Sequence, residues 1–206
     1  MQSSRIQKTA AFTLIELMVA IALGMIVMAS VATTFTSQTR TYSAQEQINQ
    51  MEQNARGALD IMLREIKMAG YNPASGTVTG VVSYTSTTLT IQADVNGNGT
   101  LLASGVGSEA ANEQIAYAYD STNKTITRQV GSGTVETLAE NIDGLTFTYY
   151  QASGTTLATS ASDIRRVKIA ISAKTAKPDP SYPTNYGYRT VDLSATITPI
   201  NLGLTN

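Results

Sequence analysis

The chain has 206 residues, of which 42% are hydrophobic and 14% are charged, and its formal net charge is −1. This balance gives no basic field, so nucleic acid is not expected as a direct partner. Histidine and cysteine are both absent, which excludes disulfides, His-ligated zinc, and Ser-His or Cys-His nucleophilic catalysis. We therefore expect a protein that is not an enzyme.

The N-terminal region combines a positive flank with a long apolar run. Arg5 and Lys8 precede the stretch 17–38, in which no residue carries a formal charge. As a helix, this stretch is long enough to span about 30 Å of hydrocarbon. Glu16 stands at its front edge, where a carboxylate costs on the order of 2 kcal/mol unless it has a partner. The sequence predicts a membrane helix whose Glu16 is neutralised.

The order of these residues resembles the prepilin signal of type IV pilins and type II secretion pseudopilins: a basic leader, a small residue, then Phe-Thr-Leu-Ile-Glu-Leu running into an apolar helix. The resemblance implies that a membrane peptidase cuts between Ala11 and Phe12 and methylates the new amino group of Phe12. It also implies that Glu16 neutralises that amine as the subunit enters a filament. The family nearly always has Gly where this chain has Ala11, so we expect cleavage to be slower.

Two other interpretations of the apolar run are available. An ordinary secretory signal has a shorter apolar core of about 7 to 15 residues, followed by the cleavage site. A membrane anchor that is never cut needs the same length and the same positive flank, so hydropathy alone does not exclude it. Cleavage by a prepilin peptidase separates the filament subunit from the static anchor.

The second half of the expected helix has an apolar face. Apolar residues recur there at three- and four-residue steps, and charged residues recur every fourth position on other faces. No proline lies between Phe12 and Gly70, so we expect one helix over about residues 12–69, ended by Gly70 and Pro73. The apolar positions are Ala44, Ile48, Met51, Ala55, Ala58, Leu59, Met62, Ile66 and Ala69, and the charged ones are Glu52, Arg56, Asp60 and Arg64.

Beyond residue 77 the apolar period falls towards two, which indicates β-strands joined by Gly- and Ser-rich turns. A short helical turn is expected at 138–142. The fold class expected is α+β and pilin-like, with a long N-terminal helix, transmembrane in its first half and amphipathic in its second, packed on a mainly antiparallel sheet domain. The expected strands are 78–84 with 89–93, 115–119 with 125–130 around a turn at 120–123, and then 145–149, 167–171 and 191–197.

These patterns divide the chain into four segments. Residues 1–11 are the leader, and residues 12–36 are the half of the helix that lies in the membrane or the filament core. Residues 37–70 are the amphipathic half of the helix. Residues 71–206 are a β-rich globular domain in the periplasm or outside the cell.

One motif has the character of a metal site. Asp94, Asn96 and Asn98 place side-chain oxygens at alternate positions, and Gly99 stands at the sixth. This order matches the opening of an EF-hand-type loop, in which the oxygens bind calcium. The same residues also suit a turn between strands, because Asp, Asn and Gly favour positive φ and local hydrogen bonds. We therefore expect no cofactor, with calcium at Asp94, Asn96 and Asn98 as the alternative.

The rest of the EF-hand pattern is missing. The acid expected at the twelfth place falls on Gly105, so Glu109 or Glu113 would have to fold back to supply the charge. Otherwise we expect these two glutamates to be solvated. The same expectation holds for Glu136 and Glu140.

Two polar groups on the globular domain are alternative contact surfaces. Arg165, Arg166 and Lys168 form the one basic cluster, which we expect on a solvated strand face, with Val167 and Ile169 pointing inward. A Pro-rich loop carries three tyrosines, which would suit a neighbouring subunit or a sugar. These tyrosines are Tyr182, Tyr186 and Tyr188.

The segments 46–71, 112–117 and 142–149 resemble PilW-type minor pilins, and in part the J-type pseudopilin of general secretion. The resemblance implies a low-copy subunit that helps to initiate pilus assembly at or near the tip and supports adhesion, twitching motility or DNA uptake. Its partners would be other pilins through the N-terminal helix, the prepilin peptidase and the inner-membrane assembly platform. It would cross the bacterial inner membrane once, with its globular domain in the periplasm, before entering the filament. A type II secretion minor pseudopilin and an uncleaved membrane-anchored periplasmic binding domain remain alternatives.

Overall fold

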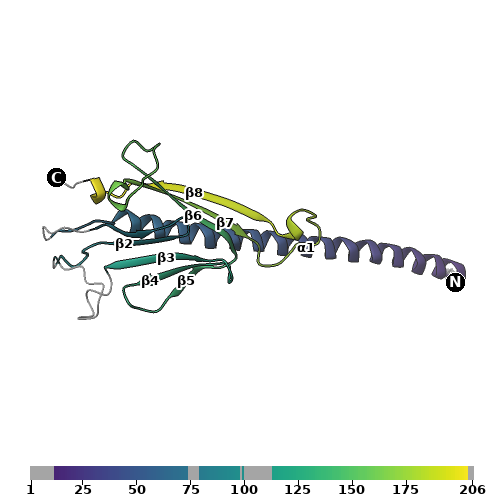
Figure 1. The fold of residues 1–206 in the computed structure, drawn as a ribbon. Helices are drawn as coiled ribbons and strands as arrows, with labels where there is room; N and C mark the ends of the chain where they lie inside the picture. Colours follow the sequence, from purple (N-terminus) through teal and green to yellow (C-terminus); the bar gives the residue numbers. More distant parts are fainter. Residues whose placement is uncertain (1–11, 74–78, 98, 100–112, 204–206) are drawn as a thin grey trace, which may run out of the picture. The chain divides into compact units, whose positions relative to one another are not determined.

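A computed structural model describes residues 12–73, 79–97, 99 and 113–203, and Figure 1 shows its elements in chain order. The chain separates into two compact units, Met1–Glu46 and Gln47–Asn206. Each unit is described by itself.

One α-helix, α1 (Leu14–Lys67), accounts for the whole N-terminal part of the described chain, close to the expected bounds of 12–69. The chain leaves the helix through Gly70, whose φ of +80° is the left-handed conformation that glycine adopts without strain. The Gly70 N–H donates to the carbonyl of Gln92 at 2.8 Å. The end of the helix is therefore tied directly to a strand.

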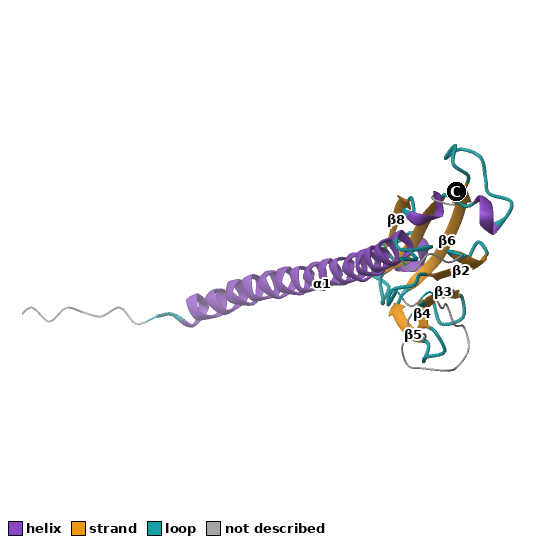
Figure 2. Ribbon diagram, turned by 90° about the vertical axis from the view of Figure 1, so that its left-hand side faces the viewer, coloured by secondary structure: helices purple, strands orange, loops and turns teal. Residues whose placement is uncertain are grey.

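In the described residues, eight strands form two antiparallel sheets, so the predicted antiparallel character is confirmed. The first sheet has the order β1-β2-β3-β4-β5 and the second has the order β6-β7-β8. Figure 2 shows the loops and turns that join the strands. The strands are β1 (Val81–Tyr84), β2 (Thr88–Gln92), β3 (Gln114–Asp120), β4 (Thr125–Val130), β5 (Glu136–Ala139), β6 (Ile142–Tyr150), β7 (Arg166–Lys174) and β8 (Thr190–Ile197).

The helical turn expected at 138–142 is wrong. Residues of this segment form the end of β5, where Ala139 lies opposite Ile126 of β4. Asn141 then turns the chain at a φ of +58°, and Ile142 begins β6 with its N–H donating to the carbonyl of Lys124 at 2.9 Å. Pairing with β4 outweighs the weak local preference for a helix.

The buried hydrophobic residues of the described chain form one core cluster, to which the C-terminal half of α1 and both sheets contribute. Figure 1 shows this half of the helix beside the strands of both sheets. The expected apolar face of the helix is confirmed, because its residues from Met51 to Ala69 are buried. Both sheets contribute alternate residues of their strands. The fully buried side chains include Met62 and Ile66 of the helix, Leu89, Tyr117 and Ile126 of the first sheet, and Leu145, Ile169 and Ile171 of the second.

Tyrosine hydroxyls join the two sheets at β6. The Tyr149 hydroxyl reaches the carbonyls of Thr85 and Thr88 at 2.9 and 3.0 Å, in the turn between β1 and β2. From the other side, the Tyr119 hydroxyl of β3 donates to the carbonyl of Asp143 at 2.7 Å. Burial raises the pKa of Tyr149, so this hydroxyl keeps its proton and remains a donor.

A polar cluster fastens the helix to the first sheet. Arg128 of β4 forms a paired contact with Glu65 of α1, with Nη2 to Oε1 at 2.7 Å and Nε to Oε2 at 3.0 Å. The Tyr117 hydroxyl of β3 donates to the same carboxylate. Burial raises the pKa of Tyr117, and the Glu65 carboxylate raises it further. Glu65 and Arg128 are each 22% exposed, so water weakens their attraction only in part.

Candidate assembly site at the N-terminal helix

The helix begins with a reciprocal pair of hydrogen bonds between Thr13 and Glu16. The Thr13 N–H and hydroxyl donate to Glu16 Oε2 at 2.9 and 2.8 Å, and the Glu16 N–H approaches Thr13 Oγ1 at 3.4 Å. This arrangement is a capping box, in which each side chain accepts an N–H that the first turn of a helix leaves unpaired. The pattern Thr-x-x-Glu is visible in the sequence, and our sequence analysis missed it.

Glu16 therefore has a local role that sequence reasoning did not assign. Its carboxylate is directed to the backbone of Thr13, the residue that follows Phe12. A carboxylate in the first turn also interacts favourably with the positive end of the helix dipole. The arrangement holds a negative charge beside the position that the Phe12 amine would occupy after cleavage. Ala11, the other side of the expected cleavage site, lies outside the described residues.

The first half of α1 carries exposed apolar side chains, which no other described part of the chain covers. Phe12 is 85% exposed, and every described residue as far as Ser43 is exposed. An 18-residue window of this helix has a mean hydropathy of 2.4 and contains no buried residue, so its length and composition would allow it to cross a membrane. The face that carries Glu16 also carries Phe12, Ile15, Val19, Ala20 and Leu23.

The calcium motif lies where the chain leaves β2. Asp94 is fully buried, and its two carboxylate oxygens accept the N–H groups of Gly97 at 2.7 Å and Gly99 at 2.9 Å. The Asp94 N–H donates to the carbonyl of Tyr71 at 2.8 Å, so the loop is attached to the chain that follows α1. The turn between strands that the sequence also suits is therefore present, and the Asp94 carboxylate stabilises it. Asn98 lies outside the described residues, as does Glu109.

The expectation that Glu113 is solvated is wrong. Glu113 is only 4% exposed. The Ala93 N–H donates to its backbone carbonyl at 2.9 Å, which holds Glu113 next to the residue that precedes Asp94. Burial raises the pKa of the Glu113 carboxyl, the N–H of Asn96 opposes this shift, and the charge of Asp94 adds to it. No local pattern predicts this contact, because Asp94 and Glu113 are far apart in the sequence and meet only through the pairing of Ala93 with Glu113. Glu136 and Glu140 are exposed, as expected.

The basic cluster and the tyrosine loop are partly used within the chain. Val167 and Ile169 are fully buried and Lys168 is exposed, which confirms the predicted alternation of β7. Arg165 donates to the carbonyls of Ser162 and Ile164 at 2.6 and 3.0 Å.

In the loop, the Arg189 guanidinium lies 4.6 Å from the ring centre of Tyr182, and the Lys174 ammonium lies 5.2 Å from that of Tyr188. Tyr186 is 94% exposed. Of the three tyrosines, only Tyr186 is left as a fully exposed contact residue.

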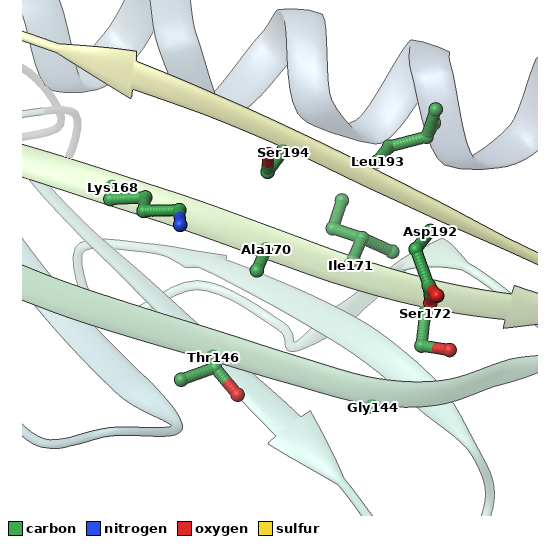
Figure 3. A pocket seen from close by; sticks show the side chains of 9 residues that line it. All are labelled: Gly144, Thr146, Lys168, Ala170, Ile171, Ser172, Asp192, Leu193 and Ser194. Carbon is green, nitrogen blue, oxygen red and sulfur yellow. The ribbon is translucent and has the colours of Figure 1, made fainter.

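The outer face of the second sheet is hollowed where small residues follow one another across β6, β7 and β8 (Figure 3). Thr146, Ala170 and Ser194 lie opposite one another across the three strands, and Gly144 lies opposite Ser172 in a neighbouring row. Lys168 and Asp192 are the charged residues of the hollow. Its volume is about 320 Å³. One lysine and one aspartate do not form a nucleophile with its base, so the hollow offers no catalytic arrangement of that kind.

Comparison with known proteins supports the interpretation of the N-terminus. Residues 6–32 match the family model of the prokaryotic N-terminal methylation motif. No curated protein matches the sequence. Among solved structures, the chain is similar to a type IV-like pilin from Thermus thermophilus, with 11% identity and a TM-score of 0.46 over 73% of this chain and 97% of that one. The chain thus carries a prepilin-type methylation motif on a long helix that is followed by antiparallel sheets.

Proposed function

We propose that the chain is a subunit of a type IV pilus or a related pseudopilus. It is made as a prepilin, cut between Ala11 and Phe12, methylated at Phe12 and inserted into the filament through its apolar half-helix. The observation that carries this proposal is that the methylation motif at 6–32 covers the start of a helix whose apolar side chains are exposed. Within this class, the sequence segments 46–71, 112–117 and 142–149 favour a PilW-type minor pilin that helps to initiate assembly near the tip. Adhesion, twitching motility or DNA uptake would then be the process served.

The exposed apolar half-helix explains both of the locations that this function requires. In the inner membrane, hydrocarbon covers Leu14, Ile15, Val19 and the residues that follow them. In the filament, helices of other pilins take the place of lipid, so the apolar surface never has to enter water. The protein acts by packing, and the proposed role is not enzymatic. The prepilin peptidase and the assembly platform of the inner membrane are its processing and assembly partners.

Glu16 is the residue that connects processing to assembly. Before cleavage its carboxylate caps the helix through Thr13. Cleavage creates a positive amine on Phe12, directly before Thr13. In a poorly hydrated filament core, the attraction between this amine and a Glu16 carboxylate favours a fixed register between subunits.

The mature N-terminus tests the proposal. The full chain is expressed with and without a prepilin peptidase, and the N-terminal peptide is analysed by mass spectrometry. We expect the chain to begin at N-methylated Phe12 only when the peptidase is present. An intact leader in the presence of an active peptidase would contradict the proposal and favour a static membrane anchor.

The role of Glu16 is tested by two variants that separate charge from capping. Gln at this position still completes a capping box but carries no charge, whereas Ala does neither. We expect Glu16→Gln and Glu16→Ala to be inserted and cleaved like the wild type, but to enter pili at least tenfold less, as measured by immunoblotting of sheared filaments. Normal incorporation of Glu16→Gln would show that capping is the only role of this residue.

A further inference from the structure

A buried pair of acids lies at the junction of α1, β2 and β3. Asp94 is fully buried and Glu113 is 4% exposed. Backbone hydrogen bonds hold both residues in place: Asp94 donates to Tyr71 after the helix, and Ala93 donates to the carbonyl of Glu113 just before β3. The pair therefore belongs to the packed part of the globular unit.

The buried Glu113 carboxylate has no positively charged partner in the described part of the chain. Its two side-chain oxygens are buried and make no hydrogen bond of ordinary geometry in the described residues, and only the N–H groups of Asn96 and Val95 lie near enough to lower its pKa. Asp94 adds a second negative charge beside it. Burying an uncompensated carboxylate costs several kcal/mol, so a positive charge or a proton has to balance the pair.

The geometry points to a calcium site in which Asp94 and Glu113 bind one Ca²⁺ together, with Asn96 as a third oxygen ligand. All three residues offer hard oxygen donors, and the chain has no histidine or cysteine for a softer metal. The hydrogen bonds from Gly97 and Gly99 orient the Asp94 carboxylate but leave it capacity to bind, because a carboxylate has about four acceptor positions.

The ligand set indicates both the choice of ion and its affinity. Two carboxylates, one asparagine, backbone carbonyls and water suit the irregular, oxygen-rich coordination of calcium better than the strict octahedron of magnesium. No group of three acids gathers in the described residues. The affinity should therefore be weak, with a dissociation constant on the order of 10⁻⁴–10⁻³ M, as in extracellular modules. Such a site would be occupied by calcium outside the cytoplasm.

Bound calcium would stabilise the globular unit by joining the end of the helix to two strands. The site lies on the loop that is attached to Tyr71, and one of its ligands directly precedes β3. The inference is independent of the proposed function, since it concerns only the residues of this junction.

The test is thermal unfolding of the full chain in detergent micelles, titrated with calcium chloride and, separately, with magnesium chloride. At about 5 mM calcium we expect the midpoint of the wild type to rise by about 4 °C, and magnesium to have less than a third of this effect. Glu113→Gln should rise by less than about 1 °C. The exposed Glu140→Gln is the matched control, and it should respond like the wild type.

Direct titration of the wild type with calcium in a calorimeter gives a second measurement that depends on no variant. Measurable heat with one site per chain, lost in Asp94→Asn, supports the proposal. No heat and no calcium-dependent shift in the wild type would overturn it and leave a proton shared between the two acids. A shift of the same size in Glu113→Gln would also overturn it.

Discussion

The cluster of Glu65, Arg128 and Tyr117 shows how one residue of the helix fixes the position of the first sheet. Its members come from α1, β4 and β3, and each is at least partly shielded from water. Removing the negative charge would leave a half-buried guanidinium without its partner. Leaving the Arg128 guanidinium unpaired lowers the free energy of unfolding by more than the intact ion pair raises it.

We expect Glu65→Gln to lower the free energy of unfolding by about 2 kcal/mol, as measured by urea denaturation followed by circular dichroism. Glu52→Gln is the matched control on the same helix, because Glu52 forms an exposed contact with Arg56 at 3.4 Å. That change should cost less than about 0.5 kcal/mol. Equal effects of the two variants would show that the cluster of Glu65, Arg128 and Tyr117 contributes no more to the free energy of unfolding than the exposed pair of Glu52 and Arg56.

The lowered pKa of Asp179 predicts that the stability of the Pro-rich loop depends on pH. Hydrogen bonds from Ser181, and then the Arg189 guanidinium at 3.0 Å, hold the pKa of its carboxyl below the ordinary value. A lowered pKa means that the native state favours the charged form. The resulting stabilisation is present at neutral pH and is lost as the pH falls through the pKa of the native state.

We therefore expect Asp179→Asn to be less stable than the wild type at pH 7 and to approach it in acid. Urea denaturation between pH 7 and pH 2.5 measures this convergence. A constant difference over the whole range would show that the effect of the variant does not come from the charge of Asp179.

At the scale of elements, α1 contains a glycine, Gly57, whose replacement by alanine should stabilise the helix. Gly57 lies on the exposed face of the helix, and an added Cβ would meet no atom within 4 Å. Glycine in a helix interior is less favourable than alanine by about 1 kcal/mol, since its backbone loses more freedom on folding.

Gly57→Ala should accordingly raise the free energy of unfolding of the globular unit by about 0.5–1 kcal/mol, as measured by urea denaturation. Gly80→Ala is the opposite control. A Cβ there would lie 2.7 Å from the Gly70 nitrogen, so we expect clear destabilisation. A loss of stability in Gly57→Ala would indicate that this face of the helix is covered in the protein as purified.

The whole molecule is divided between a part that folds by itself and a part that depends on its surroundings. Every buried residue of α1 lies at or beyond Met51, and the rest of the core comes from the two sheets. Ile48 still packs against this core and Gln47 accepts a hydrogen bond from the Lys177 N–H, whereas every described residue from Phe12 to Ser43 is exposed. Their order in the cell must come from lipid or from other helices.

A chain that begins at Ser37 should therefore unfold in water with a free energy within about 1 kcal/mol of that of the full chain in mild detergent. A chain that begins at Leu59 loses Met51, Ala55 and Ala58 from the core and should be destabilised by several kcal/mol. Circular dichroism during thermal unfolding measures both. A large loss in the chain from Ser37 would mean that the apolar half supports the globular unit.

The sequence alone determined the helix, the turns and the motifs whose residues lie close together along the chain. The helix followed from its apolar period, the absence of proline and the glycine at position 70, and the turn of the hairpin between β3 and β4 followed from Asp120, whose carboxylate caps it. The capping box of Thr13 and Glu16 was equally readable and was overlooked. The methylation motif was recognised for the same reason, since its residues are contiguous.

Only the tertiary structure decided what depends on distant partners. Alternation shows which residues of a strand point inward, but it names no neighbouring strand, so the division into two sheets and the strand at 136–139 were not foreseeable. Glu113 has the same composition-based expectation as the exposed Glu140, yet it is buried against Asp94. Burial and pairing are properties of the packed chain, because desolvation depends on every group that surrounds a residue and not on its neighbours in sequence.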